Sequence, residues 1–328
     1  MKAMLVDAEK HLIWSDVPEP VLEDDRVLIE IEAAALNRAD LLQRRGTYPS
    51  PKGWPQWMGL EVAGYISAVG RIAAANSSLK VGDPVCALLG GGGYAQRVAV
   101  PYRMVMPIPR GLSMPEAASL PEAYATSYLN LFHEAHLSAG QTIYIAAGAS
   151  GLASVAIPMA KAFGAKVVTS VLSAQIAKSI EPLGADIVVD TSTQALEEVF
   201  RDLDEKGTPI NCAMDCLCGE ALGKCLPYMA EGGYWIVIST LAGTETNLLL
   251  RPLLTRGLHL VGSMLRKRSV AEKAELLAEL VERVWPKLES GEIRPSLYKV
   301  LPMSQAEEAH AILEKGENIG KVVLTLHS

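Results

Sequence analysis

The sequence has no excess of positive charge. Its 30 Lys and Arg residues stand against 37 Asp and Glu residues, which gives a formal net charge of −7. Such a chain repels a phosphate backbone unless its basic residues gather on one face. The only tight basic run is Arg266, Lys267 and Arg268, and short runs of this kind usually face solvent. We therefore expect no nucleic-acid partner, and the same balance disfavours an RNA-binding role.

Cysteine is scarce and badly spaced for metal. The chain has five cysteines, an odd number. Structural zinc sites usually take paired ligands two to four residues apart in two separate knuckles. Here the segment that holds the four clustered cysteines contains an expected strand, 211–215, and an expected helix, 220–229, so we expect buried structural thiols, no disulfide and no metal site. The cluster consists of Cys212, Cys216, Cys218 and Cys225.

The sequence also lacks an obvious targeting or membrane segment. Residues 1–13 carry several charges and have neither the apolar run nor the small-residue cleavage site of a signal peptide, which predicts a cytoplasmic protein. Residues 141–160 are free of charge and long enough to span a bilayer. However, Gly148, Gly151 and Pro158 interrupt them, and their first half is β-rich while their second half is helix-like. This pattern favours a buried strand, turn and helix, so we expect no membrane association.

What is present is a regular alternation of strands and helices. A chain of 328 residues predicts about two domains at roughly 100 to 200 residues each. Near-continuous apolar strands alternating with helices indicate a doubly wound parallel sheet that binds a nucleotide. We expect strands at 142–147, 166–171, 186–189, 211–215, 233–239 and 258–262, and helices at 151–163, from 173, 194–205 and 220–229.

The segments on either side of this region read differently. Short β segments separated by Gly, Pro and Asp-rich turns indicate an antiparallel β region near the N-terminus. After the parallel sheet we expect the remaining elements to return to that β region. The expected strands are 27–34, 62–69, 84–88, 94–100, 297–301 and 321–326, and the expected helices are 270–288 and 304–314.

The sharpest motif lies between the first expected parallel strand and its helix. Glycines there permit a tight turn and a close approach of the backbone to a pyrophosphate, next to the positive end of the helix. A purely structural turn remains the alternative. The residues expected to bind the cofactor are Gly148, Ala149, Ser150, Gly151 and Leu152.

The end of the second parallel strand normally selects the cofactor. An acidic residue there binds the ribose of NAD, whereas a basic residue accommodates the 2′-phosphate of NADP. This chain has neither between residues 168 and 171. Ser170 and Ser173 are the only local donors, with Lys178 one helical turn further on. The choice between NADPH and NADH therefore stays open.

Several stretches together resemble one family. Over essentially its whole length the chain resembles the zinc-free quinone oxidoreductases of the medium-chain dehydrogenase/reductase superfamily, in the branch of the tumour-suppressor-inducible enzymes. The resemblance implies a GroES-like β-rich catalytic domain, residues 1–118 and 264–328, and a Rossmann domain, residues 119–263. The stretches that carry it are 36–46, 59–64, 81–85, 91–95, 263–266 and 318–324.

The resemblance also implies a catalytic set without metal. Zinc-dependent relatives carry Cys where this chain has Asn37 and His where it has Leu60. Without a Lewis acid, the chemistry is expected to depend on hydride transfer from a reduced cofactor to an electrophile. By similarity Asn37 and Tyr48 face the nicotinamide and substrate, and Arg266 borders the substrate cleft. Each also has a purely structural alternative, as a turn amide, a loop aromatic or a solvated cation.

The cofactor set implied by the resemblance extends beyond the glycine motif. Its further members are Thr126, Ser239, Thr240, Leu241, Leu265 and Asn318. Two departures put NADPH preference in doubt. Relatives that prefer NADPH place a Lys shortly after the Ser of the second strand and a Tyr after the third, where this chain has Ser173-Ala174-Gln175 and Asp190-Thr191. Asp190 is expected to repel a nearby phosphate.

The leading hypothesis is an NAD(P)H-dependent quinone oxidoreductase, with NADPH as the cofactor, NADH as the alternative, and a quinone or other electrophilic carbonyl compound held between the domains. Reduction of the C=C bond of an enal or enone on the same fold is an alternative. A nucleotide-binding relative with little catalysis is another. The resemblance alone predicts a homodimer.

Overall fold

The computed structural model describes residues 1–316 and 318–326 and divides into two compact units. We call residues 1–125, 268–291 and 295–328 the β-rich unit, and residues 126–267 with 292–294 the parallel-sheet unit. The first boundary falls inside helix α4 (Pro121–Tyr128), seven residues later than the expected 118/119. The Glu61 carboxylate accepts a 2.8 Å hydrogen bond from the Glu122 N–H, which ties the start of α4 to the β-rich unit.

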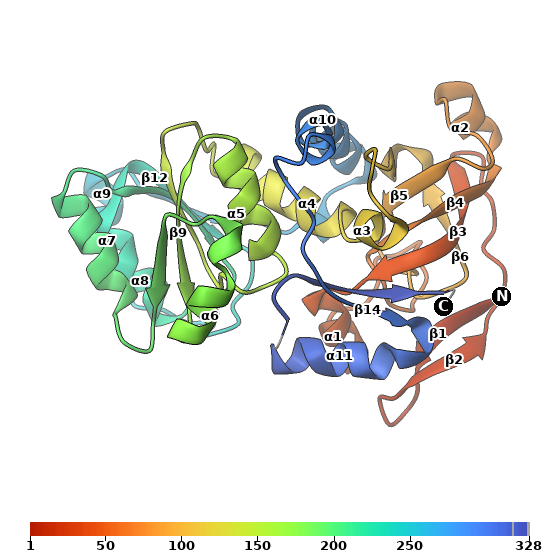
Figure 1. The fold of residues 1–328 in the computed structure, drawn as a ribbon, viewed down its shortest axis with the longest axis horizontal. Coiled ribbons are helices and arrows are strands. Elements are labelled where there is room, and N and C mark those ends of the chain that lie inside the picture. Colours follow the sequence, from red (N-terminus) through yellow and green to blue (C-terminus); the bar gives the residue numbers. More distant parts are fainter. Residues whose placement is uncertain (317, 327–328) are drawn as a thin grey trace. The chain divides into compact units, whose positions relative to one another are not determined.

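The parallel-sheet unit is the expected doubly wound Rossmann fold (Figure 1). Its six parallel strands lie in the order β10-β9-β8-β11-β12-β13, so the chain order reverses between β8 and β11. Ligands bind such sheets at the carboxyl ends of the strands where the order reverses. The strands are β8 (Thr142–Ile145), β9 (Lys166–Val171), β10 (Ile187–Asp190), β11 (Ile210–Asp215), β12 (Met229–Val237) and β13 (His259–Gly262).

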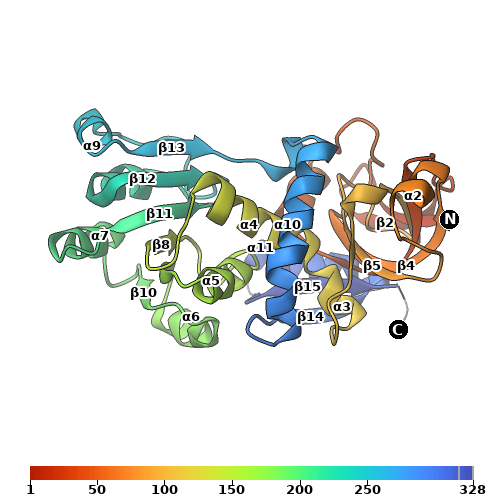
Figure 2. The ribbon, with the colours of Figure 1, turned by 90° about the horizontal axis from the view of Figure 1, so that it is seen from above.

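Helices cover both faces of this sheet, with α7 and α9 on one side and α5 on the other (Figures 1 and 2). Because both faces are covered, its inner strands are apolar on both sides. Phe200 of α7 and Trp235 of β12 are fully buried and pack with ring centroids 5.9 Å apart. The helical segments are η2 (Leu129–Glu134), α5 (Ala153–Ala162), α6 (Ala174–Ser179), η3 (Glu181–Leu183), α7 (Leu196–Glu205), α8 (Glu220–Cys225), η4 (Leu226–Tyr228), α9 (Leu250–Thr255) and η5 (Leu265–Lys267).

The β-rich unit is built on a seven-stranded sheet in which β14, β15, β3, β4, β5 and β7 follow one another and β6 also pairs with β3. The expected return of the C-terminal elements is confirmed, since β15 runs antiparallel to β3 with Val323 opposite Ala35. A separate hairpin joins β1 and β2. The strands are β1 (Lys2–Val6), β2 (Leu12–Asp16), β3 (Arg26–Ala35), β4 (Glu61–Val69), β5 (Pro84–Leu88), β6 (Arg97–Pro101), β7 (Val105–Pro107), β14 (Leu297–Pro302) and β15 (Lys321–Thr325).

Two helices of the β-rich unit, α1 and α11, lie side by side (Figure 1). Arg44 and Arg45 on α1 pair with Glu307 and Glu314 on α11 at 2.7 and 2.8 Å. The sequence did not predict α1, which begins after Asn37 and ends at Gly46 in a left-handed conformation with φ +85°. The helical segments are α1 (Arg38–Arg45), α2 (Arg71–Asn76), η1 (Tyr102–Met104), α3 (Met114–Ala118), α4, α10 (Val270–Glu289), η6 (Met303–Gln305) and α11 (Ala306–Lys315).

The expected burial of the cysteines is confirmed for four of the five. All five are free thiols, and all except the half-buried Cys216 are buried. Burial raises the pKa of the Cys212 thiol to about 12, which keeps it protonated. Across residues 1–316 and 318–326, His, Cys, Asp and Glu side chains form no group of three or more that would hold a metal ion. Over the same ranges, none of the helices combines the length and apolar character of a membrane span.

Candidate functional site

The glycine motif forms a tight loop between β8 and α5. Ala147 has φ +54°, and its carbonyl accepts a 2.8 Å hydrogen bond from the Ser150 N–H. The Gly148 N–H donates to the Ser170 carbonyl at 2.9 Å, which holds the loop against the end of β9. A Cβ at Gly148 would lie 2.6 Å from Thr169 Oγ1, so any other residue would force the Thr169 side chain or the loop to shift.

This loop presents backbone donors. Within the described part of the chain, the N–H groups of Ala149, Gly151 and Leu152 donate no hydrogen bond to a protein acceptor. They lie at the N-terminal end of α5, where the helix dipole also favours negative charge. The loop follows β8, one of the two strands at which the order of the sheet reverses. The residues present therefore fit the phosphates of a dinucleotide.

The expected ribose end of the site is less complete. Ser173 accepts a 3.3 Å hydrogen bond from the Ile176 N–H and so caps α6. The buried Ser170 hydroxyl shares a 2.8 Å hydrogen bond with the Tyr144 hydroxyl. Asp190 lies opposite Val171 in the register of β10 and β9. An acidic group thus stands beside the end of β9 although β9 itself carries none.

The other expected cofactor residues of the parallel-sheet unit lie in three places. Thr126 is half-buried in α4, and its carbonyl accepts a 2.7 Å hydrogen bond from Asn130 Nδ2. Ser239, Thr240 and Leu241 follow β12, and Leu241 is 51% exposed. In η5, Leu265 is buried, and the neighbouring Arg266, expected in the catalytic set, is half-buried.

In the β-rich unit, Asn37 lies at the centre of a buried polar cluster between β3 and α1. Its Oδ1 accepts a 2.8 Å hydrogen bond from Lys321 Nζ, and its Nδ2 donates at 2.9 Å to Glu61 Oε1. Lys321 Nζ is itself 2.7 Å from Glu61 Oε1. The side chains of Lys321 and Glu61 are 5% and 0% exposed, so solvent hardly screens this ion pair.

Asp40 extends the same cluster. It is fully buried, and it accepts hydrogen bonds from the Asn37 N–H at 2.8 Å, the Gly59 N–H at 3.2 Å and the Tyr94 hydroxyl at 3.2 Å. Burial raises the pKa of Asp40 to about 6, although these hydrogen bonds and the charge of Lys321 oppose the shift. The pKa of Tyr94 is raised well above its usual value, first by burial and then by the Asp40 charge. Tyr94 is therefore a permanent donor to Asp40.

Two further expected residues lie in loops of the β-rich unit. Tyr48 is half-buried in the loop after α1. Asn318 Nδ2 donates to the Gly320 carbonyl at 2.7 Å and so closes the turn before β15. Gly320 has φ +98°, and a Cβ there would lie 2.5 Å from the Ser296 carbonyl oxygen.

The sequence did not predict a role for Glu61 or Lys321. Each is followed directly by a run of buried apolar residues: Glu61 starts β4 and Lys321 starts β15. A charge in such a position is rarely buried without a partner. That contrast is the signal that could have identified them, but their pairing depends on the sheet topology.

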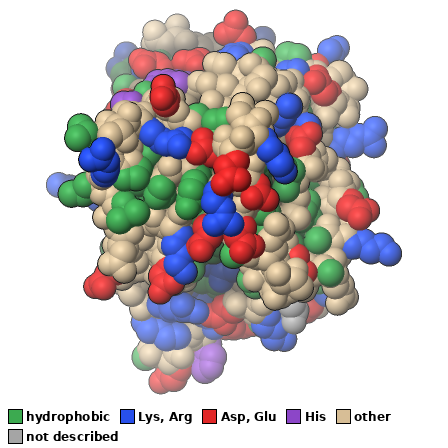
Figure 3. Space-filling view, turned by 90° about the vertical axis from the view of Figure 1, so that its left-hand side faces the viewer, with side chains coloured by type: hydrophobic (Ala, Val, Ile, Leu, Met, Phe, Trp, Pro, Cys, Tyr) green, Lys and Arg blue, Asp and Glu red, His purple; other side chains and the backbone are tan. Residues whose placement is uncertain are grey.

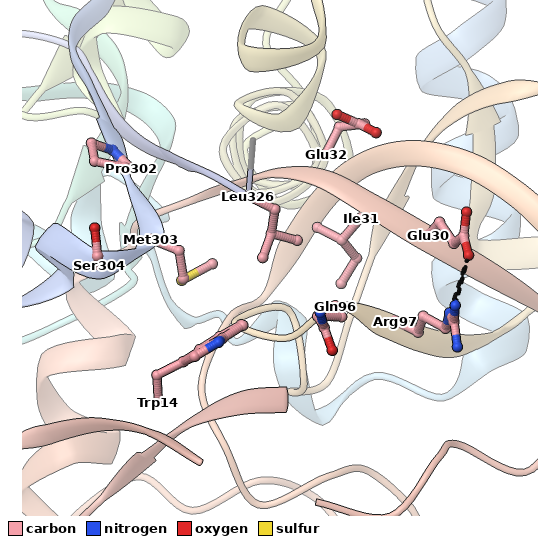
Figure 4. A pocket seen from close by; sticks show the side chains of 10 residues that line it. All are labelled: Trp14, Glu30, Ile31, Glu32, Gln96, Arg97, Pro302, Met303, Ser304 and Leu326. Atoms are coloured by element: carbon pink, nitrogen blue, oxygen red, sulfur yellow. Dashed lines mark hydrogen bonds and ion pairs between the residues drawn. The ribbon is translucent and has the colours of Figure 1, made fainter. Parts of the chain in front are cut away.

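A separate hollow of about 590 Å³ lies in the β-rich unit (Figure 4). Trp14, Ile31, Met303 and Leu326 form its apolar part, and Arg97 on its rim pairs with Glu30 at 3.0 Å. None of the residues expected in the active site lines it.

Comparison with known proteins places these features in context. Residues 23–110 match the family model described as alcohol dehydrogenase GroES-like domain, and residues 183–324 match that described as zinc-binding dehydrogenase. The chain is 29% identical to the quinone oxidoreductase-like protein 2 homolog of Nematostella vectensis, over 92% of this chain and 82% of that protein.

Two proteins named quinone oxidoreductase are also similar to it. Identity to that of Sus scrofa is 29%, over 96% of this chain and 93% of the relative. The solved structure of the Thermus thermophilus quinone oxidoreductase, also described in complex with NADPH, superimposes with a TM-score of 0.82 at 28% identity. That superposition covers 99% of this chain and 100% of the other.

Proposed function

Since the chain belongs to the medium-chain dehydrogenase/reductase superfamily, we propose that it is a metal-independent oxidoreductase that transfers hydride from NADPH to a quinone. The names of the quinone oxidoreductase relatives support the substrate class, and the Thermus thermophilus complex supports the cofactor. NADH remains the alternative because Asp190 stands beside the end of β9.

The observation that carries metal independence is the Lys321 ammonium beside Asn37. Asn37 and Leu60 stand where zinc-dependent relatives carry Cys and His, and neither side chain is a good zinc ligand. Lys321 Nζ already places one positive charge 2.8 Å from Asn37 Oδ1. The amide oxygen, with which Asn37 would have to ligate a cation, is thus already engaged by this ammonium.

When bound, the reduced nicotinamide supplies a hydride, which is one proton with two electrons, and is oxidised. A quinone that accepts the hydride needs one further proton to become a hydroquinone. The Tyr48 hydroxyl is the proposed donor of that proton, which solvent then replaces. Asn37 and Arg266 stabilise the negative charge that develops on the quinone oxygen. The N–H groups of Ala149, Gly151 and Leu152 would hold the pyrophosphate.

The test is a parallel fluorescence titration with NADPH and NADH, followed by cofactor oxidation on addition of a simple quinone or an enone. Binding with quinone-dependent oxidation is expected. Faster turnover of the enone would favour C=C reduction instead. Binding of neither cofactor would contradict the proposal and leave a relative with little catalysis.

We also propose a homodimer formed along β13. This strand lies at the edge of the parallel sheet, and unpaired edges readily add another strand. Hydrophobic side chains gather toward one side of the outer face of this unit (Figure 3). Leu250 and Leu254 of α9 and Leu260 of β13 are 70%, 82% and 42% exposed. Sedimentation analysis is expected to give a dimer for the wild type and a monomer for Leu260→Arg.

A further inference from the structure

The orientation of the Asn37 carboxamide is dictated by its two neighbours. An ammonium has only donors, so Lys321 must face the oxygen of the amide. An ionised carboxylate has only acceptors, so Glu61 must face the nitrogen. The distances are 2.8 Å from Lys321 Nζ to Asn37 Oδ1 and 2.9 Å from Asn37 Nδ2 to Glu61 Oε1. Rotating the amide by 180° would replace two charge-assisted hydrogen bonds with two repulsive contacts.

Neither neighbour has freedom to move. Lys321 uses its three N–H groups on the Leu36 carbonyl at 2.7 Å, Asn37 Oδ1 and Glu61 Oε1. The other oxygen of Glu61 accepts the Glu122 N–H at 2.8 Å. Because both side chains are buried and fully bonded, they hold the amide rigidly.

One donor of Asn37 is left over. Across residues 1–316 and 318–326, the second N–H of Nδ2 has no acceptor, and Asn37 is half-buried rather than enclosed. Its Oδ1, in contrast, already accepts from Lys321. The cluster therefore offers a ligand one oriented hydrogen-bond donor.

We propose that Lys321 and Glu61 are positioning residues that make Asn37 a dedicated hydrogen-bond donor to the carbonyl oxygen of an electrophilic substrate. This rests on the proposed function and specifies how the same site recognises its substrate. A donor held in one orientation stabilises an oxygen that gains negative charge without reorganising during the reaction. An electrophilic carbonyl is thus favoured over a ligand that must donate a hydrogen bond to Asn37.

The test is a double-mutant cycle on quinone-dependent NADPH oxidation. Lys321→Met with Glu61→Gln removes both buried charges together, and Asn37→Ala removes the amide. Each change is expected to lower kcat by about 10- to 100-fold and to leave the NADPH Kd within about twofold. If Lys321 and Glu61 act through Asn37, adding their two substitutions to Asn37→Ala lowers kcat no further. Independent, multiplying losses would overturn the proposal.

The matched control is Lys299→Met with Glu308→Gln. This pair also joins opposite charges at 2.6 Å, between β14 and α11, but is exposed. Its kcat is expected to stay within about twofold of the wild type. Thermal unfolding of every variant identifies those that fail to fold. For a paired variant that does not fold, the exchange rates of the Asn37 Nδ2 protons in the wild type decide the orientation instead.

A second readout does not depend on activity. In protein with ¹⁵N-labelled asparagine, the two Nδ2 protons of Asn37 are expected to exchange with water at unequal rates, since only one is bonded to Glu61. The inequality is expected to disappear in the charge-pair variant. Equal rates in the wild type would overturn the proposed orientation. A wild type without quinone reduction would instead contradict the proposed function, while the exchange rates still decide the orientation.

Discussion

Lys321 Nζ lies 2.7 Å from Glu61 Oε1, and this pair joins the first residues of two strands that flank β3. Lys321 also bonds to the Leu36 carbonyl, directly after the end of β3. The ion pair therefore closes one end of the sheet across its central strand. It also holds Asn37, so the same contact bears on both stability and the proposed site.

Breaking this pair should be costly. Lys321→Met leaves the Glu61 carboxylate buried without its cation, and removing one partner of a buried pair typically costs about 3–5 kcal/mol. Lys299→Met breaks an exposed pair with Glu308 and should cost at most about 1 kcal/mol. Urea unfolding of both variants measures the difference. Similar losses would show that burial does not set the strength of the Lys321 pair.

Asp40 should make stability fall as the pH rises. Its pKa is raised from 3.8 to about 6 by burial, so the folded protein holds a proton that the unfolded chain releases. The resulting stabilisation is complete below pH 3.8 and is lost as the pH rises through 6, a loss on the order of 3 kcal/mol. Relative to Asp40→Asn, the wild type should therefore lose stability between pH 4 and 6.

The matched control for Asp40 is Asp186→Asn. The pKa of Asp186 is lowered: its hydrogen bonds and pairing with Lys161 outweigh burial, although burial is the largest single influence. Its stabilisation is thus present above the unfolded pKa and is lost as the pH falls. The measurement is the free energy of unfolding of the wild type minus that of each variant, followed against pH. Slopes of the same sign for Asp40→Asn and Asp186→Asn would contradict the assignment to Asp40.

His310 should make stability fall as the pH falls, which is the opposite of the effect of Asp40, in nearly the same pH range. Its buried ring packs edge-on against Tyr94 at 5.9 Å, and neither ring nitrogen has a hydrogen-bond partner among the described residues. Burial, with Arg44, lowers its pKa from 6.5 to about 4, although Glu307 and Glu314 raise it. The stability that neutral His310 contributes is fully present above pH 6.5 and is lost as the pH falls through 4.

A phenylalanine at position 310 tests this assignment. His310→Phe keeps a ring of similar size and removes two unsatisfied nitrogens, so it should stabilise the protein at pH 5 more than at pH 8. Guanidinium unfolding at the two pH values measures the gain. A gain that is equal at both would exclude the imidazole as the titrating group.

Gly148→Ala should weaken dinucleotide binding. The new Cβ would lie 2.6 Å from Thr169 Oγ1 and 3.0 Å from Ile180 Cδ1, so the loop must shift. We expect the Kd for NADPH to rise by at least about tenfold, which corresponds to about 1.4 kcal/mol. Thr169→Ala in the same chain should restore part of the affinity. Gly262→Ala is the control, because nothing lies within 4 Å of its Cβ.

Asp190→Asn should shift cofactor preference toward NADPH. Asp190 lies opposite Val171 at the end of β9, where a 2′-phosphate would approach its negative charge. Removing a charge that acts through water is worth about 1 kcal/mol, so the ratio of the two Kd values should change by about fivefold. Parallel fluorescence titrations with NADPH and NADH provide the measurement. An unchanged ratio would place the phosphate away from Asp190.

The sequence by itself determined the parallel-sheet unit almost completely. Its inner strands are short runs rich in apolar residues that are buried on both faces, and Gly148 of its loop leaves no room for a side chain beside Thr169. These are local properties, readable from a few consecutive residues. Helix α1 escaped prediction because only eight residues form it and its capping depends on Asp40, whose carboxylate is held by Gly59 and Tyr94 from elsewhere in the chain.

Only the tertiary structure decided the chemistry around Asn37. Lys321 and Asn37 are 284 positions apart, and Glu61 lies 24 positions from Asn37, so no local pattern links them. They meet because β15 and β4 both pair with β3, which brings the first residue of each strand to the same end of the sheet. Because Lys321 and Glu61 are buried, each charge needs the other as its partner. Together they orient the Asn37 amide.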